Sequence, residues 1–364
     1  MTSAVERIFL IRIYTSSVQD GNFTRVRWAS TERVIIFGDP SLFFATILLE
    51  ATLRCAQERD DVQVVAVCDS GRRKPIPLLY SIFRKIAVAG LMRLFEPESQ
   101  VFLKRLAFSN LHNVARRFRL KVLVPPERNI NHPEFVQYLR RNLRPTIGLS
   151  FGCLQIFGKG LLRVFDQAVN YHNSLLPNYR GLCATRWSIY HGEPQSGFTF
   201  HLMNSMIDDG HILIQGAVPL APNANPLEVE FRKTLKAANY VENVIEMLRE
   251  SDLGRPQRDT VSYFGREELK NIKTIYHPSA YAYAELQRRL RCFQVLYFPI
   301  RGRMYEVTKI REVDGCRPGR HEFCFFTSDE RPVELYRFLH MPFPLYRIYR
   351  LMRRVELERL SALY

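Results

Sequence analysis

The sequence contains no run of eighteen or more uncharged apolar residues, so it predicts no membrane-spanning helix. Its N-terminus lacks the basic start and apolar core of a signal peptide, because Arg7 and Arg12 interrupt the apolar residues 8–14. The seven cysteines are scattered and form neither a CxxC pair nor a Cys/His spacing typical of metal sites. These absences predict a cytoplasmic protein with reduced thiols and no bound metal.

Two catalytic signatures are also missing. The glycine in Gly38-Asp39-Pro40 follows a buried run, but no GxGxxG accompanies it, which disfavours a dinucleotide site. No Gly-x-Ser-x-Gly elbow is found, which disfavours a serine nucleophile. The 364 residues are 46% hydrophobic and carry a net charge of +16. This composition predicts a large core, and the length predicts two domains. The charge predicts an anionic partner such as nucleic acid, a phosphorylated substrate or a membrane surface.

The order of apolar runs predicts the fold class. A buried run at 34–37, a helix-like stretch at 41–56 and a second buried run at 62–68 form a strand–helix–strand unit. Further strand signals at 121–124 and 145–152 flank a helix-like 132–143, and a helix is expected over 226–250. This alternation is typical of an α/β protein with a Rossmann-like parallel sheet.

The run 169–181 reads Val-Asn-Tyr-His-Asn-Ser-Leu-Leu-Pro-Asn-Tyr-Arg-Gly and is the most informative part of the chain. Asn170 and His172 are two positions apart, so in a strand both side chains project from one face. An amide that stabilises an oxyanion beside an imidazole that moves a proton is what acyl transfer needs. Alone, the pair is also explained as a strand end with a histidine satisfied by hydrogen bonds.

A second segment supplies an acid. Residues 197–203 read as a strand. Residues 207–213 read as a short loop that contains Asp208 and Asp209, followed by a second apolar strand. An aspartate that the fold brings next to an imidazole can fix the tautomer of that imidazole. His201 and His211 flank this loop, and we expect both to be structural because they lie in strand-like apolar segments.

The Asn-x-His-x-Ser-Leu-Leu-Pro-x-Tyr-Arg-Gly run, followed by Asp-x-Gly, resembles the formyltetrahydrofolate-dependent N-formyltransferase family, which includes methionyl-tRNA formyltransferase and amino-sugar N-formyltransferases. The resemblance implies the formyltransferase fold and 10-formyltetrahydrofolate as formyl donor. It assigns Asn170 as oxyanion donor, His172 as general base and acid, and Asp208 as the group that orients His172. Asp209 departs from the family, which usually has Thr or Ala there.

The resemblance also implies a folate site and a substrate loop. Residues 152–156 read Gly-Cys-Leu-Gln-Ile where relatives commonly have Gly-Leu-Ile-Leu-Pro, so the proline is lost and Gln155 is gained. Residues expected to bind the cofactor are Phe151, Gly152, Cys153, Leu154, Ile156, Ile207 and Asp209. Residues expected to shape the substrate loop are Ser174, Leu175, Pro177, Tyr179, Arg180 and Gly181.

The implied activity is formyl transfer to a primary amine, with methionyl-tRNA, a nucleotide-linked amino sugar or another small amine as acceptor. A hydrolase that releases formate stays an alternative, because water can replace the amine in the same geometry. A non-catalytic folate-binding relative is a further alternative. The positive charge also suits a polyglutamyl folate.

The chain is expected to divide into four parts. An extension at 1–32 with a hairpin signal precedes a catalytic domain at 33–255. A small β-rich domain at 260–330 resembles a partial OB-like barrel, and a basic helical tail occupies 331–364. The divergent stretch 72–118 is amphipathic and cationic, which fits a membrane-surface helix, a lid over the folate site or a buried surface helix.

Overall fold

The structure, a computed structural model, describes residues 31–40, 42–71, 110–258, 261–301, 303–313 and 323–336. The predicted hairpin of the extension, the cationic part of the 72–118 stretch and most of the tail lie outside these residues. Within the described ranges, no helix is long and apolar enough to cross a membrane. The boundaries expected for the domains stay a prediction.

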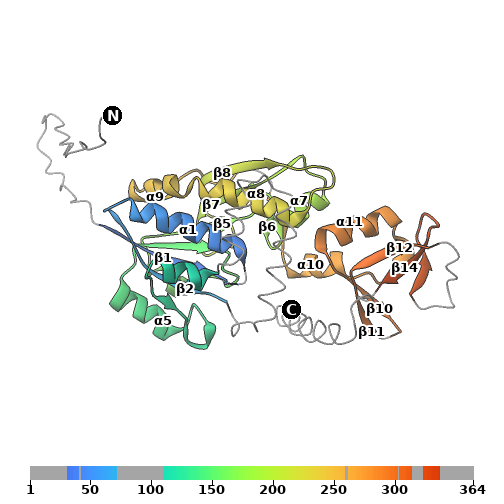
Figure 1. Cartoon of the computed structure of the whole chain (residues 1–364), viewed down its shortest axis with the longest axis horizontal. Coiled ribbons are helices and arrows are strands. Elements are labelled where there is room, and N and C mark those ends of the chain that lie inside the picture. The colour runs from blue at the N-terminus through green and yellow to red at the C-terminus, as the bar shows by residue number, and fades with distance from the viewer. Residues whose placement is uncertain are drawn as a thin grey trace, which may run out of the picture. The chain divides into compact units, whose positions relative to one another are not determined.

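A seven-stranded sheet forms the centre of the larger, N-terminal part of the described residues (Figure 1). Its strands are β1 (Glu32–Gly38), β2 (Val62–Asp69), β3 (Val122–Leu123), β4 (Ile147–Phe151), β5 (Gln167–His172), β7 (Gln195–Leu202) and β8 (Ile212–Pro219). Their order is β3-β2-β1-β4-β5-β7-β8. The first five pair in parallel, whereas β7 and β8 are antiparallel. The predicted α/β class with a mainly parallel sheet is confirmed.

Helices cover both faces of this sheet (Figure 1). One face carries α1 (Phe43–Gln57), α4 (Leu111–Arg117), α8 (Pro226–Ala238) and α9 (Val241–Arg249). The other carries α5 (Pro133–Tyr138), the π-helical turn Leu139–Leu143 that continues it, and α6 (Lys159–Leu162). A short 3-10 turn, Pro126–Arg128, precedes α5.

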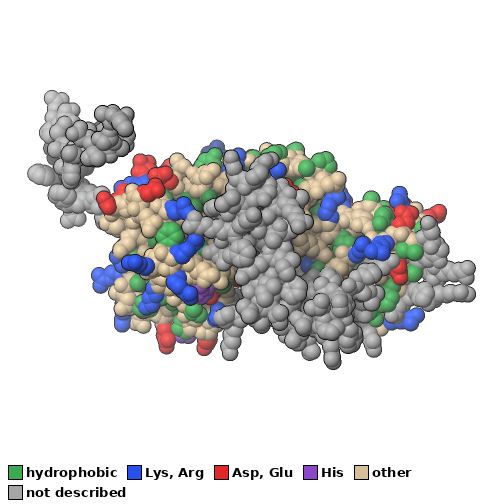
Figure 2. Space-filling view, in the orientation of Figure 1, with side chains coloured by type: hydrophobic (Ala, Val, Ile, Leu, Met, Phe, Trp, Pro, Cys, Tyr) green, Lys and Arg blue, Asp and Glu red, His purple; other side chains and the backbone are tan. Residues whose placement is uncertain are grey.

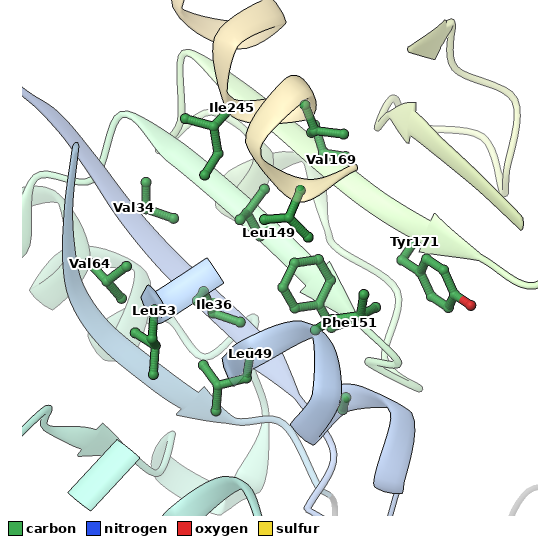
Figure 3. Packing of buried hydrophobic residues seen from close by; sticks show 14 of the residues in the cluster. Val34, Ile36, Leu49, Leu53, Val64, Leu149, Phe151, Val169, Tyr171 and Ile245 are labelled. Atoms are coloured by element: carbon green, nitrogen blue, oxygen red, sulfur yellow. The ribbon is translucent and has the colours of Figure 1, made fainter. Parts of the chain in front are cut away.

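The position of strand β1 explains why residues 34–37 form a continuous apolar run. Val34 and Ile36 pack into the cluster on the first face (Figure 3), whereas Ile35 and Phe37 pack into the cluster on the second. All four side chains are fully buried, because successive residues of a strand point to opposite faces and both faces are covered.

One predicted helix is divided. The stretch 226–250 forms α8 and α9 instead of a single helix, because the backbone of Tyr240 leaves the helical conformation at φ −104° and ψ 1°. The Tyr240 ring packs against Phe198 of β7 at a centroid distance of 5.9 Å.

The C-terminal part has its own core. It contains α10 (Arg266–Lys273), a 3-10 turn (Pro278–Ala280), α11 (Tyr283–Phe293), the hairpin β10 (Leu296–Ile300) and β11 (Arg303–Val307), and a sheet of β12 (Lys309–Glu312), β14 (Pro332–Tyr336) and β13 (Cys324–Phe326). The prediction that the tail is helical from residue 331 is wrong at its start. Val333 and Leu335 are buried alternately, with period two, which favours a strand.

The positive charge is distributed unevenly. Arginines of the C-terminal part pair with acids, as Arg289 does with Glu285 and Arg331 with Asp329. Residues 110–163 instead hold ten Arg or Lys against two acids. Figure 2 shows Lys and Arg side chains spread over the surface where Figure 1 draws α5 and its neighbours.

Candidate active site

Strand β5 places the predicted amide and imidazole on one face of the sheet. Val169 and Tyr171 point into the apolar cluster shown in Figure 3. Asn170 and His172, which alternate with them, therefore project from the opposite face. His172 is only 7% exposed, and Asn170 is half-buried.

The loop between β7 and β8 brings Asp208 to this pair. Its Oδ2 lies 3.4 Å from Nδ1 of His172, and its Oδ1 accepts a hydrogen bond of 3.3 Å from Nδ2 of Asn170. Oδ2 also accepts a bond of 2.9 Å from the backbone N–H of Gly181. The three residues that the sequence assigns to catalysis therefore meet in one place.

Burial and charge act in opposite directions on the two titratable groups. Burial alone would raise the pKa of the Asp208 carboxyl, but His172, His201 and the N–H of Gly181 lower this pKa well below its usual range. Burial lowers the pKa of His172, and the charge of Asp208 opposes this shift only in part. The site thus favours a carboxylate beside a neutral imidazole, which is the state a general base needs.

His201 belongs to this site, although we expected a structural histidine. It lies directly opposite Asn170 in the pairing of β5 with β7. Its Nδ1 donates to the carbonyl oxygen of Leu202 at 2.8 Å, so its Nε2 is left to accept from Nδ2 of Asn170 at 3.2 Å. Nε2 is also 3.5 Å from Asp208. His201 therefore orients the amide of Asn170, and only the strand register could have revealed this.

The motif loop closes over His172. The carbonyl oxygen of Tyr179 accepts a hydrogen bond of 2.8 Å from Nε2 of His172. Tyr179 has a φ of +60°, and its hydroxyl donates to Glu193 at 2.6 Å. A neutral imidazole has one N–H, so this bond leaves Nδ1, which faces Asp208, without a proton.

The other predicted loop residues support the backbone. Ser174 Oγ donates to the carbonyl oxygen of Asn178 at 2.6 Å. Ser174 therefore stabilises the backbone of the loop and is not placed as a nucleophile. Leu175 packs where a side chain on Gly197 would otherwise be, and Pro177 follows a cis peptide bond. Gly181 has a φ of +93°, and a Cβ there would lie 2.4 Å from the carbonyl oxygen of Phe264.

The motif arginine pairs with the residue that departs from the family. Arg180 forms an ion pair with Asp209, and its guanidinium also donates to the side chain of Gln257. Arg180 is 11% exposed on its side chain. The negative charge of Asp209 is therefore neutralised within the protein, and its expected contact with folate stays a prediction.

The residues expected at the folate site divide into buried and exposed groups. Phe151 is part of the core, and Gly152 has a φ of +72° with the ring of Phe44 against it. Cys153 is half-buried and contacts the backbone of residue 155. The exposed apolar side chains of this set are Leu154, Ile156 and Ile207, at 52%, 65% and 40%. Met206, which was not predicted for the folate site, precedes Ile207 and is 66% exposed.

Gln155 joins the loop after β4 to two other segments. Its Nε2 donates to the carbonyl oxygens of Ser70 and Arg128 at 2.7 and 3.0 Å, and its Oε1 accepts from the N–H of Ile130 at 3.3 Å. It is 6% exposed. Gln155 therefore fixes the loop, whereas its neighbours Leu154 and Ile156 stay exposed. Across the described residues, no group of three His, Cys, Asp or Glu side chains is arranged to hold a metal ion.

Comparison with solved structures shows similarity of fold. The fold matches a sugar N-formyltransferase from a Shewanella species (19% identity, TM-score 0.51, 77% of this chain and 97% of that one). It matches a 4-N formyltransferase from Francisella tularensis equally well (19%, TM-score 0.52, 77% and 97%). A third match is the N-formyltransferase from Helicobacter canadensis in complex with folinic acid and dTDP-3-aminofucose (19%, TM-score 0.50, 84% and 99%).

A family model described as formyl transferase matches residues 33–245. This range contains the seven-stranded sheet together with Asn170, His172 and Asp208. Because the match covers well over half of the 364 residues, this chain belongs to the formyl transferase family.

Proposed function

We propose that this protein transfers the formyl group of 10-formyltetrahydrofolate to a primary amine. The observation that carries the proposal is the convergence of Asn170, His172 and Asp208 in one largely buried site of a formyl transferase family member. The three come from two segments that are far apart in the chain. Their chemistry, an amide donor, an imidazole and a carboxylate, suits attack of an amine on a formyl carbon.

Asn170 stabilises the oxygen of the formyl group. In the structure its two amide hydrogens are directed at His201 and Asp208, at the long distances of 3.2 and 3.3 Å. As the amine nitrogen bonds to the formyl carbon, the carbonyl electron pair moves to the oxygen. Asn170 then exchanges its contact with Asp208 for this oxyanion, while His201 keeps the amide oriented.

His172 moves the proton. The attacking amine takes the place of the Tyr179 carbonyl oxygen at Nε2, and the Nδ1–H of the other tautomer then donates to Asp208. Nε2 accepts the proton that the amine loses. When the carbonyl reforms and the bond to N10 of the folate breaks, the same nitrogen donates this proton to the leaving N10.

The exposed apolar side chains suit a flat folate ring. Leu154 and Ile156 follow β4, whereas Met206 and Ile207 directly precede Asp208, so two loops beside the site offer apolar contact. The folinic acid in the Helicobacter canadensis structure supports a folate donor for this fold. Burial of such surface against a ring is worth about 25 cal/mol per Å².

The acceptor that we propose is a nucleotide-linked amino sugar. Support comes from the Helicobacter canadensis relative, whose structure holds dTDP-3-aminofucose and whose fold covers 84% of this chain. The net charge of +16 suits a substrate with a diphosphate group.

The test is an assay of the purified protein with 10-formyltetrahydrofolate under three conditions: no amine, a dTDP-linked amino sugar, and charged methionyl-tRNA. We expect tetrahydrofolate and a formylated sugar only with the amino sugar. Amine-independent turnover would identify a hydrolase. Turnover only with tRNA, weakening steeply as salt rises, would replace the proposed acceptor. No turnover under any condition would refute formyl transfer to these amines.

A further inference from the structure

The side chain of Gln257 contacts the loop that carries the catalytic acid. Its Nε2 donates to the carbonyl oxygens of Asp208 and Gly210, both at 2.8 Å. Asp208 has a φ of +51°, a left-handed conformation that is unfavourable for a residue with a side chain. A strained loop of this kind keeps its shape only where its surroundings hold it.

The same side chain contacts the motif loop through its oxygen. Oε1 of Gln257 accepts hydrogen bonds from Nε and Nη2 of Arg180, at 3.2 and 2.7 Å. The remaining terminal nitrogen of Arg180 pairs with Asp209. The motif arginine is thus directed at the acid loop, and Gln257 connects the two.

The backbone around Gln257 is held on both sides. Arg255 exchanges two backbone hydrogen bonds with Ile212 of β8, at 2.8 and 2.9 Å. Ser262 accepts from the backbone N–H groups of Tyr179 and Arg180, at 2.8 and 2.9 Å. Beyond it, β9 (Tyr263–Phe264) pairs in parallel with β6 (Arg180–Gly181). Arg255 is therefore fixed to the sheet two residues before Gln257, and Ser262 is fixed to the motif loop.

We propose that Gln257 is a positioning residue for the catalytic acid, so that the segment joining the catalytic and C-terminal parts completes the active site. The inference rests on the proposed function and goes beyond it, because Gln257 lies outside the residues that the family model matches. Only a primary amide can donate to two carbonyls and accept from a guanidinium at once. Glutamate would direct acceptors at both carbonyls, and leucine would leave them unpaired.

A role in positioning differs from general support of the fold in what it does to His172. Burial, His201 and Lys233 lower the pKa of His172. Asp208 and the carbonyl of Tyr179 raise this pKa and so oppose them. If Gln257 holds Asp208 in place, its loss lets the carboxylate move away, and the pKa of His172 falls. If the hydrogen bonds of Gln257 only stabilised the fold, the pKa of His172 would be unchanged in a folded Gln257 variant.

The experiment is an NMR titration of the His172 ring in the full chain, with its signal assigned through its absence in His172→Gln. Asp208→Asn sets the limit for complete loss of the carboxylate. We expect Gln257→Leu to shift the midpoint downward, to a value between wild type and Asp208→Asn, and to lower kcat at least tenfold with little change in the KM of the donor. Gln57→Leu, an exposed glutamine at the end of α1, is the matched control and should change neither.

A folded Gln257→Leu variant with the wild-type midpoint would overturn the proposal. If Gln257→Leu does not fold, Gln257→Asn, which keeps the amide but shortens its reach, is titrated in its place with the same expectation. The titration does not depend on turnover. A wild-type protein that fails to transfer formyl groups would therefore refute the proposed function and still leave the role of Gln257 to be decided by the midpoint.

Discussion

The ammonium group of Lys233 donates a hydrogen bond of 2.7 Å to the carbonyl oxygen of Asn173, the residue that follows His172. Lys233 lies on α8 and is completely buried. Its other acceptors are the hydroxyls of Thr185 and Ser196, at 2.7 and 3.4 Å. The buried amino group of Lys233, with three acceptors around it, thus supports the backbone next to His172.

This burial predicts an unusual dependence of stability on pH. Burial lowers the pKa of Lys233 to about 7, with Glu230 opposing the shift, whereas an unfolded lysine titrates near 10.4. Between these values the unfolded chain binds the proton and the folded chain does not, so stability rises with pH. The rise is at most about 1.4 kcal/mol per pH unit. We expect the free energy of unfolding of wild type to increase relative to Lys233→Met from pH 7 to pH 9.5.

Urea denaturation at pH 6.5, 8 and 9.5 measures this difference. Lys236→Met, at an exposed position on the same helix, is the control and should show no such trend. A difference between wild type and Lys233→Met that stays constant over this range would contradict the prediction.

Removal of any of the three catalytic side chains should abolish transfer without unfolding the protein. We expect Asn170→Ala, His172→Ala and Asp208→Ala to lower kcat by about 10²–10³-fold or more, because each removes oxyanion stabilisation or proton transfer. His211→Ala should retain wild-type turnover, because His211 is exposed and bonds to the carbonyl oxygen of Leu253. The assay is formation of tetrahydrofolate, with circular dichroism to check the fold. Wild-type rates in all three variants would refute the assignment.

The pH profile of kcat/KM should report His172. Burial lowers the pKa of this imidazole below its ordinary value, and a general base must be unprotonated. Activity is therefore expected to stay level through neutral pH and to fall only below about pH 6.5. In Asp208→Asn the opposing charge is gone, so the midpoint of any residual activity should move further down. A midpoint well above the ordinary histidine value would contradict this reading.

Gly210 should tolerate no side chain. A Cβ at this position would lie 1.7 Å from the carbonyl oxygen of Leu202, so the loop that carries Asp208 would have to move. We expect Gly210→Ala to lose at least about 2 kcal/mol of stability and most of its activity. Gly160→Ala is the matched control, because a Cβ there meets nothing within 4 Å and lies in α6. Thermal denaturation and the transfer assay compare the two, and equal behaviour would show that the loop adapts.

The sequence by itself was sufficient for the fold class and, through the resemblance of its motif to a known family, for the identity of the three converging side chains. Residues 34–37 are apolar at every position and 62–68 at every position except Gln63, which is what strands covered on both faces require. Asn170 and His172 share a face because the side-chain period of a strand is two. These are local rules, and they need no knowledge of distant contacts. The division of 226–250 into α8 and α9 depends on a contact between Tyr240 and β7, and so it was not predictable in the same way.

Tertiary structure alone decided how the site is held. His201 enters it through antiparallel register with Asn170, Asp209 is neutralised by Arg180, and Gln257 reaches the acid loop from a segment that reads as a polar boundary. Such partners are separated by tens of residues, and the sequence does not indicate which backbone carbonyl group a polar side chain will contact. The motif therefore identifies the chemical groups of the site. Their orientation and protonation are determined only in the folded protein, where burial removes water and the strands set the distances.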